Sequence, residues 1–196
     1  MSSEGGGHNP SLVGVLRNPV FGAYFAGSSI SNIGTWFQNV AQSILIYRMT
    51  GSTFLVGVVN FAMFAGLVAF APWAGPMADS HDRRRLLLLT QAVALCIAAS
   101  LWLVVVADAE NTAFIVGAAL MMGTAMAFSV PALQSLVPAL VPEGHLSRAL
   151  SLNAVSFNLA RAVGPVLGAM VVAGLGFAWA FFLNAASFLV FVVALL

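Results

Sequence analysis

The chain has 196 residues, of which 61% are hydrophobic and only 7% are charged, and its mean hydropathy is +0.99. Soluble domains have about a quarter of their residues charged, so this composition excludes a water-soluble enzyme, a nucleic-acid-binding protein and a disordered chain. The net charge of +1 indicates no polyanionic partner, and the single cysteine, Cys96, excludes a disulfide framework and a thiolate metal cluster.

Six long apolar stretches follow a short polar tail. The tail, residues 1–19, is rich in Ser and Gly, contains a short turn at 12–16 and lacks the basic segment of a signal peptide. A helix needs about 20 mostly apolar residues to cross the hydrocarbon core of a bilayer. Charged residues, Gly and Pro separate six such stretches, at about 21–47, 54–78, 86–107, 113–133, 149–172 and 178–196. We therefore predict an all-α membrane protein, with a cytoplasmic tail (1–19) and a six-helix transmembrane bundle (20–196).

Arginine alone determines the orientation of the predicted spans, because the chain has no lysine. With the N-terminus inside, the outer loops contain only Arg48. The inner loops then contain Arg17, Arg83, Arg84, Arg85 and Arg148. The positive-inside rule therefore predicts a multi-pass protein of the cell membrane, with both ends of this chain in the cytoplasm.

The first predicted span contains many polar residues, which are costly in hydrocarbon and usually face a bundle interior or a wet cavity. At 3.6 residues per turn, five of them share one stripe: Ser28, Asn32, Thr35, Asn39 and Gln42. The stripe favours a pathway for a polar or amphipathic solute; the alternative is that these side chains only tie helices together. The candidate residues for the cavity lining are Asn32, Thr35, Gln38, Asn39, Gln42, Asn158 and Arg161.

Arg161 is the one charged residue inside the predicted spans. It lies 13 residues beyond Arg148, so it is about 20 Å deeper in the membrane at 1.5 Å per residue. A guanidinium stays protonated there and needs carboxylates, carbonyls or an anionic ligand. Two interpretations remain open: a role at the substrate or gate, or a partner supplied by helix carbonyls, water or a carboxylate outside this chain.

The predicted inner loop between the second and third spans contains Gly75, Asp79, Arg83 and Arg84. Asp79 lies at a helix C-terminus and the arginines at a helix N-terminus, so both oppose the helix dipoles. A hairpin whose arginines only set the topology is one interpretation. The other is a charged inner gate, in which Asp79 pairs with the arginines or caps another helix.

These four residues resemble the motif between the second and third helices of the major facilitator superfamily. Gly164, Pro165 and Gly168, which predict a bend and a close helix contact, are similar to its fifth-helix antiporter motif. Within the superfamily, the chain resembles most the bacterial exporter branch that includes the enterobactin exporter. This resemblance lies at residues 16–19, 32–38 and 158–168. The resemblance implies the N-terminal six-helix half of a twelve-helix fold, built from two inverted three-helix repeats. In such a half, helices one and four line the cavity, and helices two and five join them.

The resemblance further implies a secondary active transporter rather than an enzyme, specifically an exporter of a small polar or amphipathic solute such as a drug or a siderophore. Its partners would be that solute, the bilayer and a second six-helix half, which is either a C-terminal half missing from this chain or a second copy of it. A passive channel or a structural membrane subunit remains the alternative, with an intramembrane hydrolase as a remote third. No cofactor or metal is expected, because the sequence contains no phosphate-binding loop and no histidine within its spans.

Overall fold

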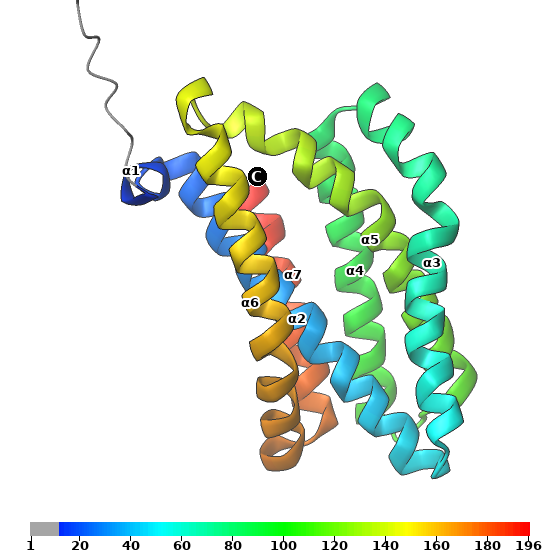
Figure 1. The fold of residues 1–196 in the computed structure, drawn as a ribbon. Helices are drawn as coiled ribbons and strands as arrows, with labels where there is room; N and C mark the ends of the chain where they lie inside the picture. The colour runs from blue at the N-terminus through cyan, green and yellow to red at the C-terminus, as the bar shows by residue number, and fades with distance from the viewer. Residues whose placement is uncertain (1–11) are drawn as a thin grey trace, which may run out of the picture.

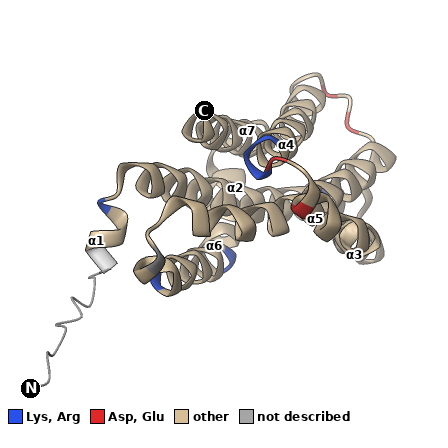
Figure 2. Ribbon diagram, turned by 90° about the horizontal axis from the view of Figure 1, so that it is seen from above, with Lys and Arg blue, Asp and Glu red and all other residues tan. Residues whose placement is uncertain are grey.

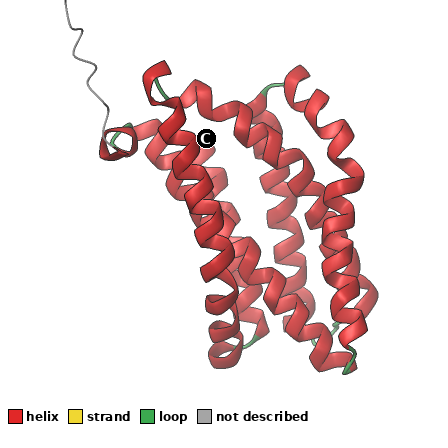
Figure 3. Cartoon of the chain, viewed as in Figure 1, coloured by secondary structure: helices red, strands yellow, loops and turns green. Residues whose placement is uncertain are grey.

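The computed structural model describes residues 12–196, which form a bundle of helices joined by short turns (Figures 1 and 3). The helices in this part of the chain are α1 (Leu12–Leu16), α2 (Pro19–Thr50), α3 (Thr53–Ser80), α4 (Arg83–Val106), α5 (Thr112–Leu140), α6 (Leu146–Leu175) and α7 (Phe177–Leu195), with a 3-10 turn at Glu143–His145. Residues 1–11 of the predicted tail lie outside the described residues. The short turn expected at 12–16 is α1.

The long helices run alternately up and down. Figure 1 shows α1, the α3–α4 turn, the α5–α6 turn and the end of α7 at one end of the bundle, which we call the inner end. Figure 2 views this end from above and shows basic positions at the α1–α2 junction and at the start of α4. Arg48 lies at the opposite end, in the last turn of α2. The fold therefore separates the arginines as the predicted orientation requires.

Five of the long helices, α3 to α7, are long and apolar enough to cross a membrane. The expectation of six spans is thus supported for five helices, and α2 does not meet this criterion. α2 is 32 residues long, so its length is sufficient, but the polar side chains between Ser28 and Ser43 lower its hydropathy. α5 also continues to Leu140, past the expected end at residue 133, because Pro131 and Pro138 are accommodated within the helix.

Short polar side chains fix where four of the described helices begin. Asn18 Oδ1 accepts hydrogen bonds from the backbone N–H groups of Val20 (3.0 Å) and Phe21 (3.3 Å) at the start of α2. The same N-cap role is played for α3, α4 and α5 by Ser52, Asp82 and Asn111. α2 ends at Gly51, whose φ of 64° is easily adopted only by glycine.

Glycines bring two pairs of helices into backbone contact. Where α3 crosses α5, a Cβ atom at Gly123 would overlap the carbonyl oxygen of Met63, and one at Gly66 would overlap that of Leu120. Where α6 crosses α2, a Cβ at Gly168 would lie 2.8 Å from the carbonyl oxygen of Phe37. Small residues at such crossings allow the close approach on which helix association in membranes depends.

The pairing of the helices repeats itself within the bundle. α3 packs most extensively against α5, and α2 packs against both α6 and α7. Helices α2, α3 and α4 can be matched in order with α5, α6 and α7. The α3–α5 contact then corresponds to the α6–α2 contact, and the α2–α7 contact corresponds to the α5–α4 contact. This is the pattern that two inverted three-helix repeats produce.

The first prediction concerns the α3–α5 crossing. Gly123→Ala should destabilise the protein by about 1–3 kcal/mol, because the added methyl group has to displace the backbone of α3 at Met63. The measurement is the thermal unfolding midpoint of the purified protein in detergent. Gly117→Ala is the matched control, since Gly117 lies on the same helix with open space around it. Equal unfolding midpoints for the two variants would show that the crossing is not tightly packed.

Candidate functional site

A cavity of about 680 Å³ lies between α2, α4, α5, α6 and α7. This volume is in the range of small-molecule binding sites. The part of the cavity wall supplied by α2 runs from Tyr24 to Trp36, and the part supplied by α6 runs from Leu150 to Asn158. Both segments begin in the inner half of their helices and end near the middle, so the cavity is nearer the inner end. The first and fourth long helices, α2 and α5, line the cavity together with α6, whereas α3 contributes no lining residue.

The lining is uncharged and combines hydrogen-bonding side chains with a larger apolar surface. None of the lining residues described by the structure is ionic. The polar members are Tyr24, Ser28, Ser31, Asn32, Thr35, Gln91, Ser129, Gln134, Asn153 and Asn158. The large apolar members include Trp36, Met122, Met126, Phe157, Phe188 and Phe191. Such a surface binds solutes that present both hydrogen-bonding groups and rings or aliphatic segments.

The predicted polar stripe on α2 divides into two parts. Ser28, Asn32 and Thr35 line the cavity. Asn39 and Gln42 do not: Asn39 Nδ2 donates to Asn60 Oδ1 on α3 (3.1 Å), and Gln42 Nε2 donates to a main-chain carbonyl of α5 (3.4 Å). The structure thus places the part of the stripe toward the inner end on the cavity wall, and the part toward the other end in bonds between helices.

Gln38 is buried where α2 meets α7 and does not line the cavity. Asn184 Nδ2 donates to Gln38 Oε1 at 2.7 Å, and Ser187 Oγ donates to Asn184 Oδ1 at 3.1 Å. Sequence reasoning missed Asn184 and Ser187, although an amide inside the last apolar stretch is itself a signal of a buried polar contact. The Asn184–Gln38 bond ties α7 to α2 beyond the deep end of the cavity, and the Ser187 bond holds the Asn184 amide within α7.

Other cavity residues were also missed from the sequence. Tyr24 lies one turn before Ser28 on the same stripe, so the periodicity alone extends to it. Gln134 lies one residue beyond the expected span 113–133 and belongs to α5 in the structure. On α6, Asn153 Nδ2 donates to the Tyr24 hydroxyl at 3.5 Å, which links the two walls of the cavity. Asn158, which was expected, lines the cavity and donates to the carbonyl of Ala154 on its own helix (2.7 Å).

Arg161 lies beside the cavity rather than in its lining. It is exposed on α6, and its guanidinium carbon lies 5.3 Å from the centroid of the Trp36 ring. It forms no ion pair with any residue that the structure describes. Near it, α6 runs without interruption through Pro165, while Gly164 and Gly168 contact the backbone of α2. The close contact is thus present, and the bend stays a prediction.

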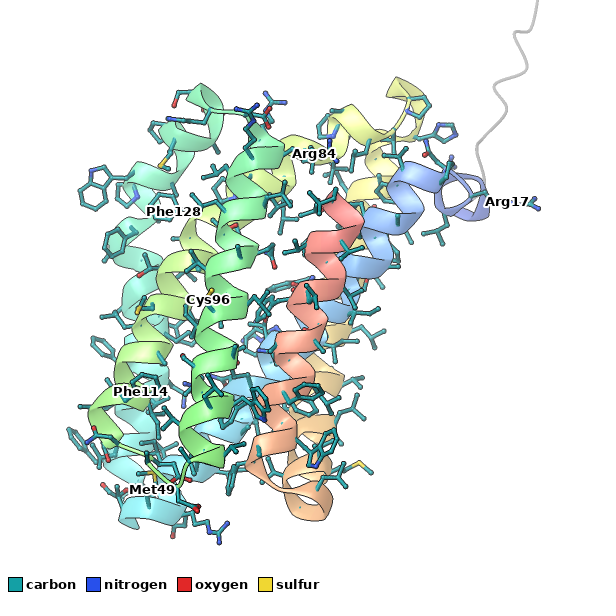
Figure 4. All side chains as sticks on the ribbon, turned by 180° about the vertical axis from the view of Figure 1, so that it is seen from behind. Arg17, Met49, Arg84, Cys96, Phe114 and Phe128 are labelled. Carbon is teal, nitrogen blue, oxygen red and sulfur yellow. The ribbon has the colours of Figure 1, made fainter. Side chains whose placement is uncertain are left out.

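At the inner end, the arginines bind helix carbonyls. Arg83 Nη1 donates to the carbonyl of Ser135 on α5 at 3.0 Å, and Arg84 Nε donates to the carbonyl of Leu195 on α7 at 2.5 Å. Figure 4 labels Arg84 where α4 begins beside the end of α7. Neither arginine forms an ion pair with Asp79, and both donate to these carbonyls instead.

The remaining members of the inner motif are free of such contacts. Asp79 is exposed on the last turn of α3 and has no hydrogen bond or ion pair with a described residue. Gly75 has open space at its Cβ position. The N-cap of α4 is Asp82, whose Oδ1 accepts from the Arg85 N–H at 2.9 Å.

Among the described residues, no group of three His, Cys, Asp or Glu side chains is arranged to hold a metal ion.

The sequence is similar to a known protein family and to curated membrane transporters. A family model described as "transmembrane secretion effector" matches residues 11–196. The enterobactin exporter EntS of Shigella boydii is 29% identical over 189 residues, which are 91% of this chain and 43% of that exporter. EntS of Salmonella typhimurium has the same identity and coverage. The staphyloferrin A transporter of Staphylococcus aureus is 24% identical over 151 residues, which are 76% of this chain and 38% of that transporter.

The chain therefore spans less than half the length of these curated relatives. The family model, in contrast, covers almost the whole chain, and the five apolar helices agree with a multi-pass membrane protein. The chain belongs to the transmembrane secretion effector family of the major facilitator superfamily, whose members are membrane transporters and not enzymes.

Proposed function

We propose that this chain forms one half of an exporter that moves a small polar or amphipathic solute, such as a drug or a siderophore, across the cell membrane. The observation that carries the proposal is the uncharged, hydrogen-bonding cavity of about 680 Å³ inside a bundle of apolar helices. The relatives support it, since two of them are named as an enterobactin exporter and a staphyloferrin A transporter.

In this proposal α2 is the sixth membrane span. Its polar side chains face the cavity or the neighbouring helices, so the bilayer need not solvate them. The cavity lies near the inner end, which the arginine distribution assigns to the cytoplasm. Toward the other end, a cluster that includes Leu45, Ile46, Leu101 and Phe181 fills the bundle. This arrangement fits an inward-facing state of an alternating-access cycle.

A second six-helix half completes the exporter in this proposal, either as further chain or as a second copy. Large apolar side chains on α3 remain exposed, including Phe54, Phe61, Val68 and Trp73. Asp79, on the same helix, is also exposed and makes no bond to the described residues. A carboxylate without a partner at the inner end can cap a helix N-terminus of the second half and hold the inner gate closed.

The second prediction follows from this gate. Asp79→Asn should lower the transport rate by about tenfold or more while leaving membrane insertion intact, because a charge-assisted hydrogen bond of about 1.5–3 kcal/mol is lost from one state of the cycle. The measurement is the export rate of the complete transporter, normalised to the protein in the membrane. Asp108→Asn, in the turn at the opposite end, is the control and should export normally. Normal export by the Asp79 variant would remove Asp79 from the gate.

The third prediction separates a transporter from a passive channel or a structural subunit. In proteoliposomes, the complete transporter should show saturable flux of its solute and counterflow, in which unlabelled solute on one side drives uptake of labelled solute from the other. Alternating access requires both, since one cavity serves each side in turn. Flux without saturation or counterflow would indicate a channel, and absence of flux would indicate a structural subunit.

A further inference from the structure

An arginine and two aromatic side chains lie together beside the cavity, between α2 and α6. The Arg161 guanidinium carbon lies 5.3 Å from the centroid of the Trp36 ring. The Trp36 ring in turn meets Phe157 edge to face, with 6.2 Å between their centroids. Trp36 and Phe157 both line the cavity, and so does Asn158, three residues before Arg161 on α6. The guanidinium is therefore continuous with the cavity surface, although it is not part of the lining.

Arg161 has no anionic partner among the described residues. The acidic side chains that the structure describes belong to the ends of helices and the turns between them: Asp79, Asp82, Asp108 and Glu110. Arg161, by contrast, lies in the middle of α6 (Leu146–Leu175). Contact with the face of one indole uses none of the in-plane N–H donors of a guanidinium. Those donors thus remain available beside a cavity that contains no other charge.

We infer that Arg161 and Trp36 form an anion-selective subsite, and that the exported solute is an aromatic anion. This inference rests on the proposed function and names the class of solute for the same cavity. The planar fork of Arg161 would hold a carboxylate or a similar flat oxyanion by two parallel hydrogen bonds. The ring of the solute would pack on Trp36 and Phe157, within reach of Asn32 and Asn158 for its hydroxyl or carbonyl groups.

A pair of probes of the same shape, one anionic and one neutral, tests this subsite. The probes are 1-naphthoate and 1-naphthamide, which share one ring system and present a carboxylate or a neutral amide. Their affinities are measured by equilibrium dialysis against the complete transporter in nanodiscs of phosphatidylcholine, a lipid without net charge. The wild type should bind 1-naphthoate about tenfold or more tightly than 1-naphthamide, as expected for charge-assisted hydrogen bonds to arginine.

Substitutions then assign the preference to Arg161. Arg161→Gln should abolish it while leaving the affinity for 1-naphthamide nearly unchanged. Arg161→Lys should retain only part of it, because lysine keeps the charge but lacks the planar fork. Arg48→Gln is the matched control, since Arg48 makes the same kind of contact with Phe177 (5.7 Å) at the other end of α2. This control should preserve the full preference for the anion.

Several results would overturn the inference. Equal affinities for the two probes in the wild type would do so, as would a preference for the anion that survives in Arg161→Gln. If Arg161 instead pairs with a carboxylate elsewhere in the transporter, Arg161→Gln should weaken both probes equally, which also contradicts the subsite. Equal probe affinities together with saturable counterflow would leave the proposed export function standing. Failure to bind either probe, together with absence of flux, would overturn both the subsite and the proposed export function.

Discussion

Hydrocarbon does not solvate polar side chains, and the structure of this bundle depends on how α2 meets that constraint. Hydroxyls such as those of Thr35 and Ser43 can donate to carbonyls of α2 itself, but the longer amide side chains must find a partner on another helix or face a space that water can enter. Toward the outer end they find partners: Asn39 bonds to Asn60 on α3, and Gln38 bonds to Asn184 on α7. Toward the inner end, Asn32 and Thr35 face the cavity instead. α2 thus packs against its neighbours in the outer half of the bundle and lines a cavity in the inner half.

The glycine contacts determine which helices surround that space. Gly66 and Gly123 hold α3 against α5, and Gly164 and Gly168 hold α6 against α2. Each pair joins one of the helices α2–α4 to one of the helices α5–α7, so these two groups of three helices are interlocked and not merely adjacent. Backbone contacts of this kind allow little sliding, because any side chain larger than hydrogen would collide with the opposite main chain. In the proposed exporter, we expect this bundle to move as a unit, so that the cavity opens to one side of the membrane and then to the other.

Much of the architecture could be predicted from the sequence, because apolar length and the positions of arginine are local properties. The helical character, five of the spans and the common end of the basic turns follow from them. The site was predicted only in part, since a helical wheel gives the face of a residue but not the neighbour opposite it. Asn39 and Thr35 share a stripe, yet one meets Asn60 and the other meets the cavity. Arg84 likewise donates a hydrogen bond to the carbonyl of Leu195, 111 residues away, and no local sequence pattern predicts this contact.

A cysteine scan along α2 tests the division of its polar stripe most directly. Single cysteines from Ser28 to Ile46, in a Cys96→Ser background, are treated from the cytoplasmic side with a thiol reagent that is soluble in water and does not cross the membrane. We expect rapid labelling at Asn32 and Thr35, which line the cavity and are only half-buried, and protection at every position beyond Gln38. Labelling of Asn39 and Gln42 as fast as that of Asn32 would contradict the sealed outer half. Protection at all positions would contradict the cavity itself.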